Sequence, residues 1–243
     1  MTEIPYYLFP LIFIVALLYA AVGHGGASGY LALMGLVGIS LNASKPIALM
    51  LNCVVAAIAF IQYYRSGFFN LKLFVLLAIA SIPCAYLGSL LTIDDHFYKK
   101  ILGIILLISS IRFLFPSSDN ELVEKPAEFL LLLIGGIIGF ISGLIGIGGG
   151  ILLTPLLLLF RWSNMKTAAC VSALFIFVNS LSGLIGQFQK GVQIQPNMYI
   201  IILVASMGGV IGSFYGARKW NVVLLRRVLS VVLIIASLKL IFI

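Results

Sequence analysis

Charged side chains are scarce in this sequence, and their scarcity limits where the protein can reside. Only 9% of the 243 residues are Asp, Glu, Lys or Arg, whereas 62% are hydrophobic and the mean hydropathy is +1.20. A soluble domain of this length needs far more charge on its surface. The composition excludes a soluble domain and predicts an integral membrane protein that contacts the lipid bilayer.

Carboxylates are absent from the middle of every apolar segment. The seven acidic residues lie at the N-terminus, in one inter-helix turn or around a central linker: Glu3, Asp94, Asp95, Asp119, Glu121, Glu124 and Glu128. Proton relays and cation sites inside membranes usually depend on buried Asp or Glu. This interior is therefore better suited to an anion or a neutral solute.

Cysteine is also scarce. The net charge of +8 is distributed in a way that excludes nucleic acid as a binding partner. Cys53, Cys84 and Cys170 lie far apart inside apolar stretches, so we expect small buried hydrophobes and neither a disulfide nor a metal or other cofactor. The basic residues stand at the ends of apolar segments and form no stripe along one face. We interpret them, including Lys45 and Lys166, as topology markers or electrostatic funnels.

Ten apolar segments form two sets of five, which predicts an all-α polytopic protein made of two homologous halves. The first set spans 4–22, 30–40, 46–64, 71–91 and 97–115, and the second spans 128–145, 151–160, 167–187, 197–217 and 222–242. The second segment of each set has about half the length that a transmembrane helix needs. We predict a first repeat over 1–115, a polar, proline-bounded linker over 116–127 and a second repeat over 128–243.

The duplication is also visible in matched residues. The segment 99–112 aligns with 226–239, because both begin with a basic pair and end on a cation, and the turn glycines Gly67 and Gly191 correspond. The halves run parallel if each first helix crosses the membrane, and they are inverted if it forms a hairpin with the short helix. The inverted arrangement divides the 15 Lys and Arg residues ten against five, and the parallel one nine against six. We favour inversion.

Each half contains a glycine cluster between a long and a short helix. The first break is Gly23–Gly26 and the second break is Gly146–Gly150, 123 positions later. Paired interruptions at matching positions are typical of the substrate site of a secondary transporter. The first N–H groups of a helix have no intrahelical partner and carry part of a positive charge, so two such starts facing one cavity could bind an anion. Alternatively, these glycines only allow tight helix crossing, as we expect for Gly135, Gly139 and Gly143.

The second break and the residues after it resemble a known family. Gly146–Gly150, then Pro155 and the run from Ala169 to Ser172, are similar to the sulfite exporter TauE/SafE family, also called the toluene-sulfonate uptake permease family, and the resemblance extends over essentially the whole chain. It implies a multi-pass inner-membrane transporter of sulfite, organosulfonates or related sulfur anions.

The first repeat departs from the family's pattern, and this leaves the substrate open. His24 occupies the variable position within the glycines, Ala27 replaces the third glycine, no proline follows, and Asn52 stands where the second repeat has Ser172.

The polar residues beside the breaks are the candidate binding residues. His24, the only histidine in an apolar region, could donate to an anion, couple transport to protons, or simply bind a backbone carbonyl as a neutral ring. Asn52 and Ser172 could donate to sulfonate-like oxygens, whereas further polar positions could equally make interhelical hydrogen bonds. The predicted substrate-binding set is His24, Gly25, Gly26, Asn52, Gln62, Gly148, Gly149, Gly150, Ser172, Asn179 and Gln187.

Three functions fit a polytopic protein with these breaks. The run Gly26-Ala-Ser-Gly29 resembles the nucleophile motif of rhomboid proteases, but no histidine stands on another membrane helix to act as its base. A passive anion channel could use the same donors. We expect a secondary transporter, not an enzyme, that moves sulfite or an organosulfonate by alternating access in the bacterial inner membrane, with both termini periplasmic. A homodimer is a further option, and export of an anion would be favoured by about 2.3 kcal/mol per charge per 100 mV.

Overall fold

Helices make up nearly all of the computed structural model, which describes residues 6–114, 124–191 and 198–242 and has no strand in those ranges. They are α1 (Leu8–Ala21), α2 (Ala27–Leu36), α3 (Leu41–Arg65), α4 (Leu71–Leu90), α5 (Asp95–Leu114), α6 (Glu128–Ile145), α7 (Gly150–Leu159), α8 (Met165–Gln189), α9 (Met198–Arg218) and α10 (Val222–Phe242). Five of them (α3, α4, α6, α8 and α9) are long and apolar enough to cross a membrane. The all-α polytopic class is therefore confirmed, while most of the predicted linker lies outside the described residues.

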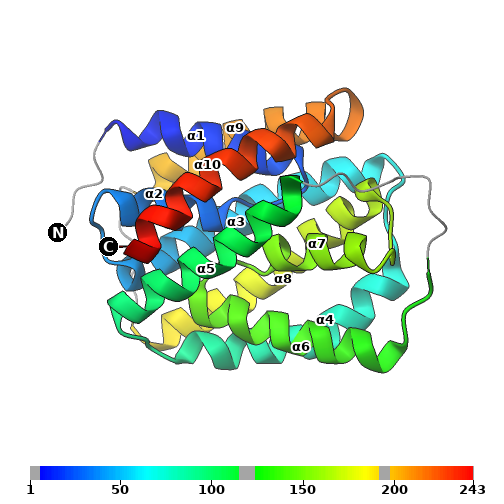
Figure 1. Ribbon diagram of the computed structural model, residues 1–243, viewed down its shortest axis with the longest axis horizontal. Helices are drawn as coiled ribbons and strands as arrows, with labels where there is room; N and C mark the ends of the chain where they lie inside the picture. Colours follow the sequence, from blue (N-terminus) through cyan, green and yellow to red (C-terminus); the bar gives the residue numbers. More distant parts are fainter. Residues whose placement is uncertain (1–5, 115–123, 192–197, 243) are drawn as a thin grey trace.

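Each half begins with a hairpin of a longer and a shorter helix. In Figure 1, α1 and α2 run in opposite directions on either side of the first break, and α6 and α7 do the same at the second break. The helix α1 has 14 residues, fewer than the 4–22 segment predicted and fewer than the roughly 20 needed to cross a bilayer. The hairpins place both breaks inside the bundle.

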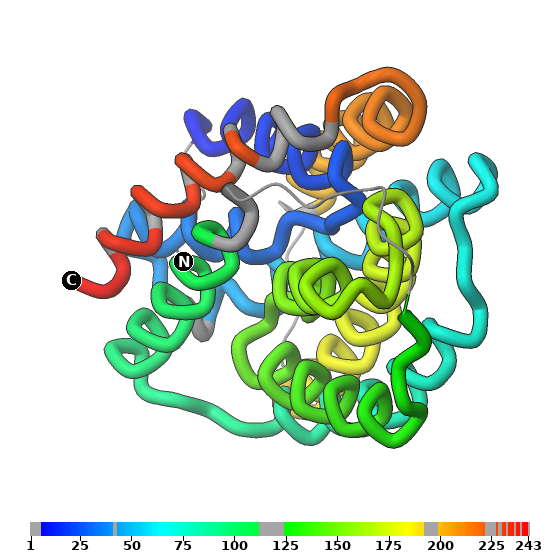
Figure 2. Tube along the Cα trace, turned by 45° about the vertical axis from the view of Figure 1, so that its right-hand side comes forward, coloured from blue at the N-terminus to red at the C-terminus, as the bar shows by residue number. Residues whose placement is uncertain are grey.

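The helices of the two halves are interleaved. The closest pairs are α1 with α9, α6 with α4, α3 with α8, and α5 with α10 (Figures 1 and 2). If α1–α5 are exchanged for α6–α10, the pair α1 and α9 becomes α6 and α4, while α3 with α8 and α5 with α10 are each unchanged. The packing therefore repeats the two-fold pattern of the sequence.

The central helices α3 and α8 run antiparallel, although they occupy equivalent places in the two halves and both have 25 residues. Leu49 of α3 lies against Gly183 of α8, and Asn52, further along α3, donates a hydrogen bond to Ser180 of α8. Residue numbers therefore rise along α3 while those of its contacts in α8 fall. Figure 1 shows the same opposition for each helix and its counterpart in the other half.

The backbone is duplicated even where the sequence is not. Seven of the eight positive-φ glycines and one arginine form four pairs that are 123 or 124 positions apart: Gly23 with Gly146, Gly26 with Gly149, Gly38 with Arg161, and Gly67 with Gly191. Arg161 is the only other residue type at positive φ in the described chain, and it takes that conformation where the first half uses glycine. The two halves thus share turns as well as helices.

Two stripes of glycine let helices from different halves touch backbone to backbone. A Cβ added to Gly135, Gly139 or Gly143 would stand 1.9–2.3 Å from a carbonyl oxygen of α4, which confirms the tight crossing predicted for them. A second stripe, Gly208, Gly212 and Gly216, meets carbonyl oxygens of α1 at 2.0–2.5 Å in the same sense. Small residues are what allow such close approach in membranes.

Adding one methyl group at a stripe glycine should destabilise the protein more than adding it at a neighbouring glycine outside the stripe. We expect Gly139→Ala to lower the free energy of unfolding by about 2 kcal/mol, because α6 and α4 must separate. Its neighbour Gly136, where a Cβ would stand 3.6 Å from the Cys84 Sγ, is the matched control. Thermal unfolding in detergent measures both variants, and equal melting temperatures would contradict the packing described here.

Candidate functional site

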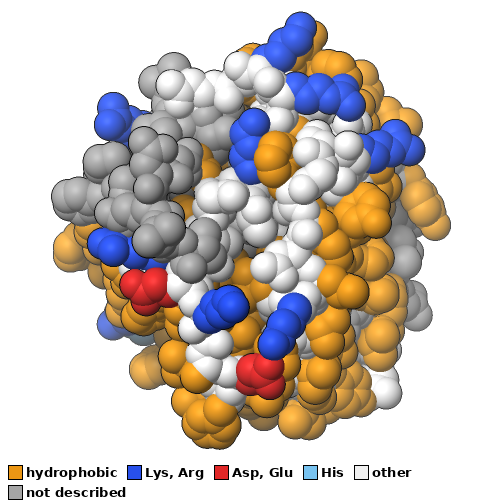
Figure 3. Space-filling view, turned by 90° about the vertical axis from the view of Figure 1, so that its right-hand side faces the viewer, with side chains coloured by type: hydrophobic (Ala, Val, Ile, Leu, Met, Phe, Trp, Pro, Cys, Tyr) orange, Lys and Arg blue, Asp and Glu red, His pale blue; other side chains and the backbone are white. Residues whose placement is uncertain are grey.

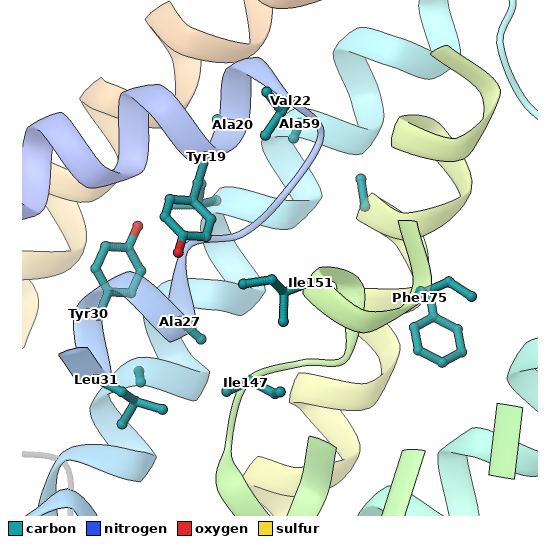
Figure 4. Packing of buried hydrophobic residues seen from close by; sticks show 14 of the residues in the cluster. Tyr19, Ala20, Val22, Ala27, Tyr30, Leu31, Ala59, Ile147, Ile151 and Phe175 are labelled. Atoms are coloured by element: carbon teal, nitrogen blue, oxygen red, sulfur yellow. The ribbon is translucent and has the colours of Figure 1, made fainter. Parts of the chain in front are cut away.

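The two breaks meet in the middle of the bundle. Gly26 precedes α2 with φ of 98° and Gly149 precedes α7 with φ of 82°, a left-handed conformation that glycine adopts without steric cost. Figure 4 shows Ile151 pointing from α7 toward the start of α2, beside Ala27 and Tyr19. The starts of both short helices therefore face one region of the protein, as the sequence predicted.

Asn52 joins the two breaks. From α3, its Oδ1 accepts the Ala27 N–H at 3.1 Å, while its Nδ2 donates to the Ser180 Oγ at 2.8 Å and to the Ile147 carbonyl at 3.4 Å. The side chain is fully buried. A Cβ on Gly25 or Gly148 would stand 2.0 or 2.2 Å from the Asn52 amide, so the space it fills exists because both breaks lack side chains there.

His24 makes a second connection between the halves. Its Nδ1 lies 3.0 Å from the Val22 carbonyl, and its Nε2 lies 3.1 Å from the Gly150 carbonyl and 3.2 Å from the Thr154 Oγ1. Thr154 in turn donates to the Ser172 Oγ at 2.7 Å. The ring is only 2% exposed. Ser172 thus belongs to the network of the second break through Thr154, which the sequence analysis had not singled out.

A narrow gap lies between the breaks, lined by Tyr19, His24, Gly25, Gly26, Ala27, Ser28, Asn52, Ile147, Ile151 and Ile176. The space between its atoms amounts to about 160 Å³, none of it wide enough for a water molecule. The Tyr19 hydroxyl and the Ser28 Oγ, 2.9 Å apart, add two more polar groups on the side of the first half. We call this space the inter-break gap.

The two walls of the inter-break gap are counterparts of each other but differ in chemistry. Ile147 and Ile151 stand 123 positions after His24 and Ser28, and Ile176 stands 124 positions after Asn52. These are the same separations that relate the paired turns. The polar side chains of His24, Ser28 and Asn52 on one wall therefore each have an isoleucine as counterpart on the other wall. A bound solute would meet hydrogen-bonding groups on one side and hydrocarbon on the other.

The predicted match between Asn52 and Ser172 is wrong by about one helical turn. Asn52 lies eleven positions after the start of α3 at Leu41, whereas Ser172 lies seven positions after the start of α8 at Met165. The apolar segments 46–64 and 167–187 miss five residues at the start of one helix and two at the start of the other, which accounts for three of the four positions. Ile176 is the true counterpart of Asn52.

The side chains of Gln62, Asn179 and Gln187 are not among those that line the inter-break gap. Asn179 donates to the Phe175 carbonyl of its own helix at 2.8 Å, and Gln187 donates to the Ser89 carbonyl at 2.7 Å. Gln62 is partly exposed and follows Asn52 by ten residues, or about 15 Å of helix. Gln62 and Gln187 are therefore not gathered at the breaks, and Asn179 makes its hydrogen bond within α8.

The ends of the helices that lead into the breaks are tied to α3. The Tyr63 hydroxyl donates to the Ala21 carbonyl at 2.8 Å, and the Lys45 Nζ donates to the Leu144 carbonyl at 2.9 Å. The last carbonyls of a helix lack intrahelical partners, and a cation there also interacts well with the helix dipole. Lys45 is 3% exposed, so it is a buried helix cap and not only a surface marker of topology.

Comparison with known proteins identifies the architecture. The sequence profile of the family described as Sulfite exporter TauE/SafE matches residues 8–240. The chain belongs to this family. It is a multi-pass membrane transporter and not an enzyme, and the Ser28 of the protease-like run lies in hydrogen-bonding contact with Tyr19.

Relatives within the family are also described as transporters. The chain is 34% identical over 235 residues to "Probable membrane transporter protein y4hK" of Sinorhizobium fredii, covering 95% of each protein. It is 26% identical over 249 residues to "Probable membrane transporter protein YjnA" of Bacillus subtilis, covering 93% of this chain and 96% of the relative. A relative in Methanocaldococcus jannaschii, "Probable membrane transporter protein MJ0441", is 35% identical over 124 residues, or 48% of this chain. No solved structure matches with significance.

The connection made by Asn52 should be visible in stability. We expect Asn52→Leu, which keeps the size of the side chain, to lower the free energy of unfolding by about 2 kcal/mol because the buried Ala27 N–H loses its acceptor. Gln62→Leu on the same helix is the control, with an expected change below about 0.5 kcal/mol. Chemical unfolding in detergent compares the two, and similar losses would argue against a special role for Asn52.

Proposed function

We propose that this protein transports small sulfur oxyanions, and that it binds them in the inter-break gap. The proposal is carried by one observation: the two glycine breaks, 123 positions apart, meet at Asn52, which hydrogen-bonds to both. Irregular backbone at membrane depth is tolerated only where it is buried in protein or lines a cavity. Two breaks in the helical backbone that meet at one side chain favour a substrate site. The name of the family favours a sulfur anion as the substrate.

The polar wall offers the donors that an oxyanion needs. The Ala27 N–H at the start of α2 is held by the Asn52 Oδ1, so the amide oxygen occupies the position that an anion oxygen would take. Rotation of the Asn52 side chain would present its Nδ2 to the same anion. Hydroxyl groups of Ser28 and Tyr19 stand beside it, and backbone N–H groups of Gly25 and Gly26 complete this wall. From the second half, we also assign the backbone N–H groups of 148–150, at the start of α7, to the proposed set.

The isoleucine wall favours a particular shape of anion. Sulfite carries three oxygens on one side of sulfur and a lone pair on the other, and a sulfonate carries an organic group in place of the lone pair. Either can turn its oxygens toward Asn52 and Ser28 and its other side toward Ile151 and Ile176. Sulfate has a fourth oxygen, which would face hydrocarbon without a hydrogen-bond partner. We therefore favour sulfite and organosulfonates over sulfate.

Transport requires the gap to open, because the gap is too narrow even for a water molecule. The opposed directions of α3 and α8 and the exchange symmetry of the helix pairs support inverted repeats over 1–115 and 128–243. Inverted repeats move by rocking of one unit against the other around a fixed site. We propose that alternating access arises in this way, in preference to a permanently open channel.

The charge distribution supports an orientation in the bacterial inner membrane. Figure 3 views the end of the bundle where α3 and α9 finish and where α4 and α8 begin, and Lys and Arg side chains are spread over it with few acidic ones. This end carries Arg65, Lys72, Lys166, Arg218 and Lys219. Cytoplasmic ends are rich in such residues, so we assign this end to the cytoplasm and both termini to the periplasm.

A panel of anions tests the proposal. We expect methanesulfonate and sulfite to raise the melting temperature of the purified protein, and sulfate and chloride to leave it unchanged. Ser28→Ala should weaken methanesulfonate binding roughly tenfold through loss of a hydrogen bond to a charged group. The control is Ser182→Ala, a buried serine that donates to the Ile82 carbonyl far from the gap. An equal response to sulfate, or equal binding by both variants, would contradict the assigned site.

A further inference from the structure

Each ring nitrogen of His24 lies within hydrogen-bond distance of a backbone carbonyl oxygen. The Nδ1 lies 3.0 Å from the Val22 carbonyl oxygen and the Nε2 lies 3.1 Å from the Gly150 carbonyl oxygen. A carbonyl oxygen has no proton to donate, so each nitrogen must carry one to form its bond. A neutral imidazole has a single N–H. The surroundings of His24 therefore match the imidazolium form, in which both nitrogens donate.

The hydroxyl of Thr154 leads to the same conclusion for one of the nitrogens. Thr154 donates its only proton to the Ser172 Oγ at 2.7 Å. It can then only accept from the His24 Nε2, which lies 3.2 Å away. The Nε2 is thus a donor by two separate contacts, and the Val22 carbonyl requires the Nδ1 to be a donor as well.

We propose that His24 binds the transported anion as an imidazolium, so that one proton is taken up with each anion. The inference rests on the proposed function, because it needs an anion in the inter-break gap that His24 lines. A charge buried in protein is costly unless an opposite charge lies close to it. The anion would supply that charge, and the hydrogen-bond acceptors for both protons are already in place.

The described side chains near His24 offer no charge that could replace the anion as partner of an imidazolium. The Tyr19 ring of α1 meets the imidazole edge-on at a centroid distance of 6.4 Å, Thr154 and Ser172 approach from α7 and α8, and Asn52 lines the same gap from α3. All four side chains are uncharged near neutral pH.

The single positive charge of the His24 imidazolium also favours one ionic form of the substrate. A monoanion would form a neutral pair with the imidazolium, whereas a dianion would leave a buried negative charge. The site is therefore matched to a sulfonate or to hydrogen sulfite, and less well to the doubly charged sulfite ion. Transport of such a pair would couple the movement of the anion to the movement of a proton.

Methanesulfonate is the probe that tests this inference, because it remains a monoanion over the whole pH range used and any pH effect comes from the protein. Calorimetric titration of the wild type at pH 7, in two buffers of different ionisation enthalpy, should show uptake approaching one proton per anion. Between pH 6 and 8.5 the affinity should fall with rising pH, by up to about tenfold per pH unit.

The two histidines of the chain provide a variant and its control. His24→Gln should bind methanesulfonate with an affinity that no longer depends on pH, whereas His96→Gln, altered at the start of α5, should keep the dependence of the wild type. The comparison of proton uptake in two buffers uses only the wild type, so it tests the inference even if the His24→Gln variant does not fold.

The outcomes separate the two proposals. Binding without proton uptake and without pH dependence would overturn the role of His24 and leave the proposed function intact, as would proton uptake that is lost in His96→Gln. Absence of binding at every pH would overturn the proposed function, and this inference with it.

Discussion

The need to satisfy backbone groups without water shapes this protein around its two breaks. A helix that stops at membrane depth leaves N–H and carbonyl groups that lipid cannot bond, and each one left alone in the interior is costly. Here side chains of the first half supply partners to both breaks. His24 of the first break lies within hydrogen-bond distance of the Gly150 carbonyl, and Asn52 accepts the Ala27 N–H while donating to the Ile147 carbonyl. Both breaks therefore depend on side chains of the first half.

Symmetry places the walls of the site, and departures from symmetry give it chemistry. Glycine stripes let α6 lie against α4 and α1 against α9, which carries both hairpins to the centre. The duplicated turns then set the two walls face to face. Within that frame, the polar His24, Ser28 and Asn52 oppose isoleucines at the equivalent positions of the second half. A fully symmetric pair of breaks would offer an anion no preferred orientation.

The sequence was sufficient to locate the two breaks and one glycine stripe, because each is a local pattern of residues. It could not place side chains across the gap, since His24 and Gly150 are 126 positions apart and meet only through packing. Thr154 is a single polar residue in an apolar segment. Its part in the hydrogen-bond network depends on His24 and Ser172, which the fold brings next to it. Gln62 shares a helix with Asn52 but not its burial, and the start of α3 was misjudged by more than one turn.

The most direct test of the central claim is a structure of the protein with 2-bromoethanesulfonate, whose bromine marks the organic end by anomalous scattering. We expect the sulfonate oxygens at the start of α2, within reach of the Ala27 N–H and the Ser28 hydroxyl, and the bromine toward Ile151 and Ile176. An anion bound outside the inter-break gap would contradict the account. So would the reverse orientation, with oxygens against the isoleucines.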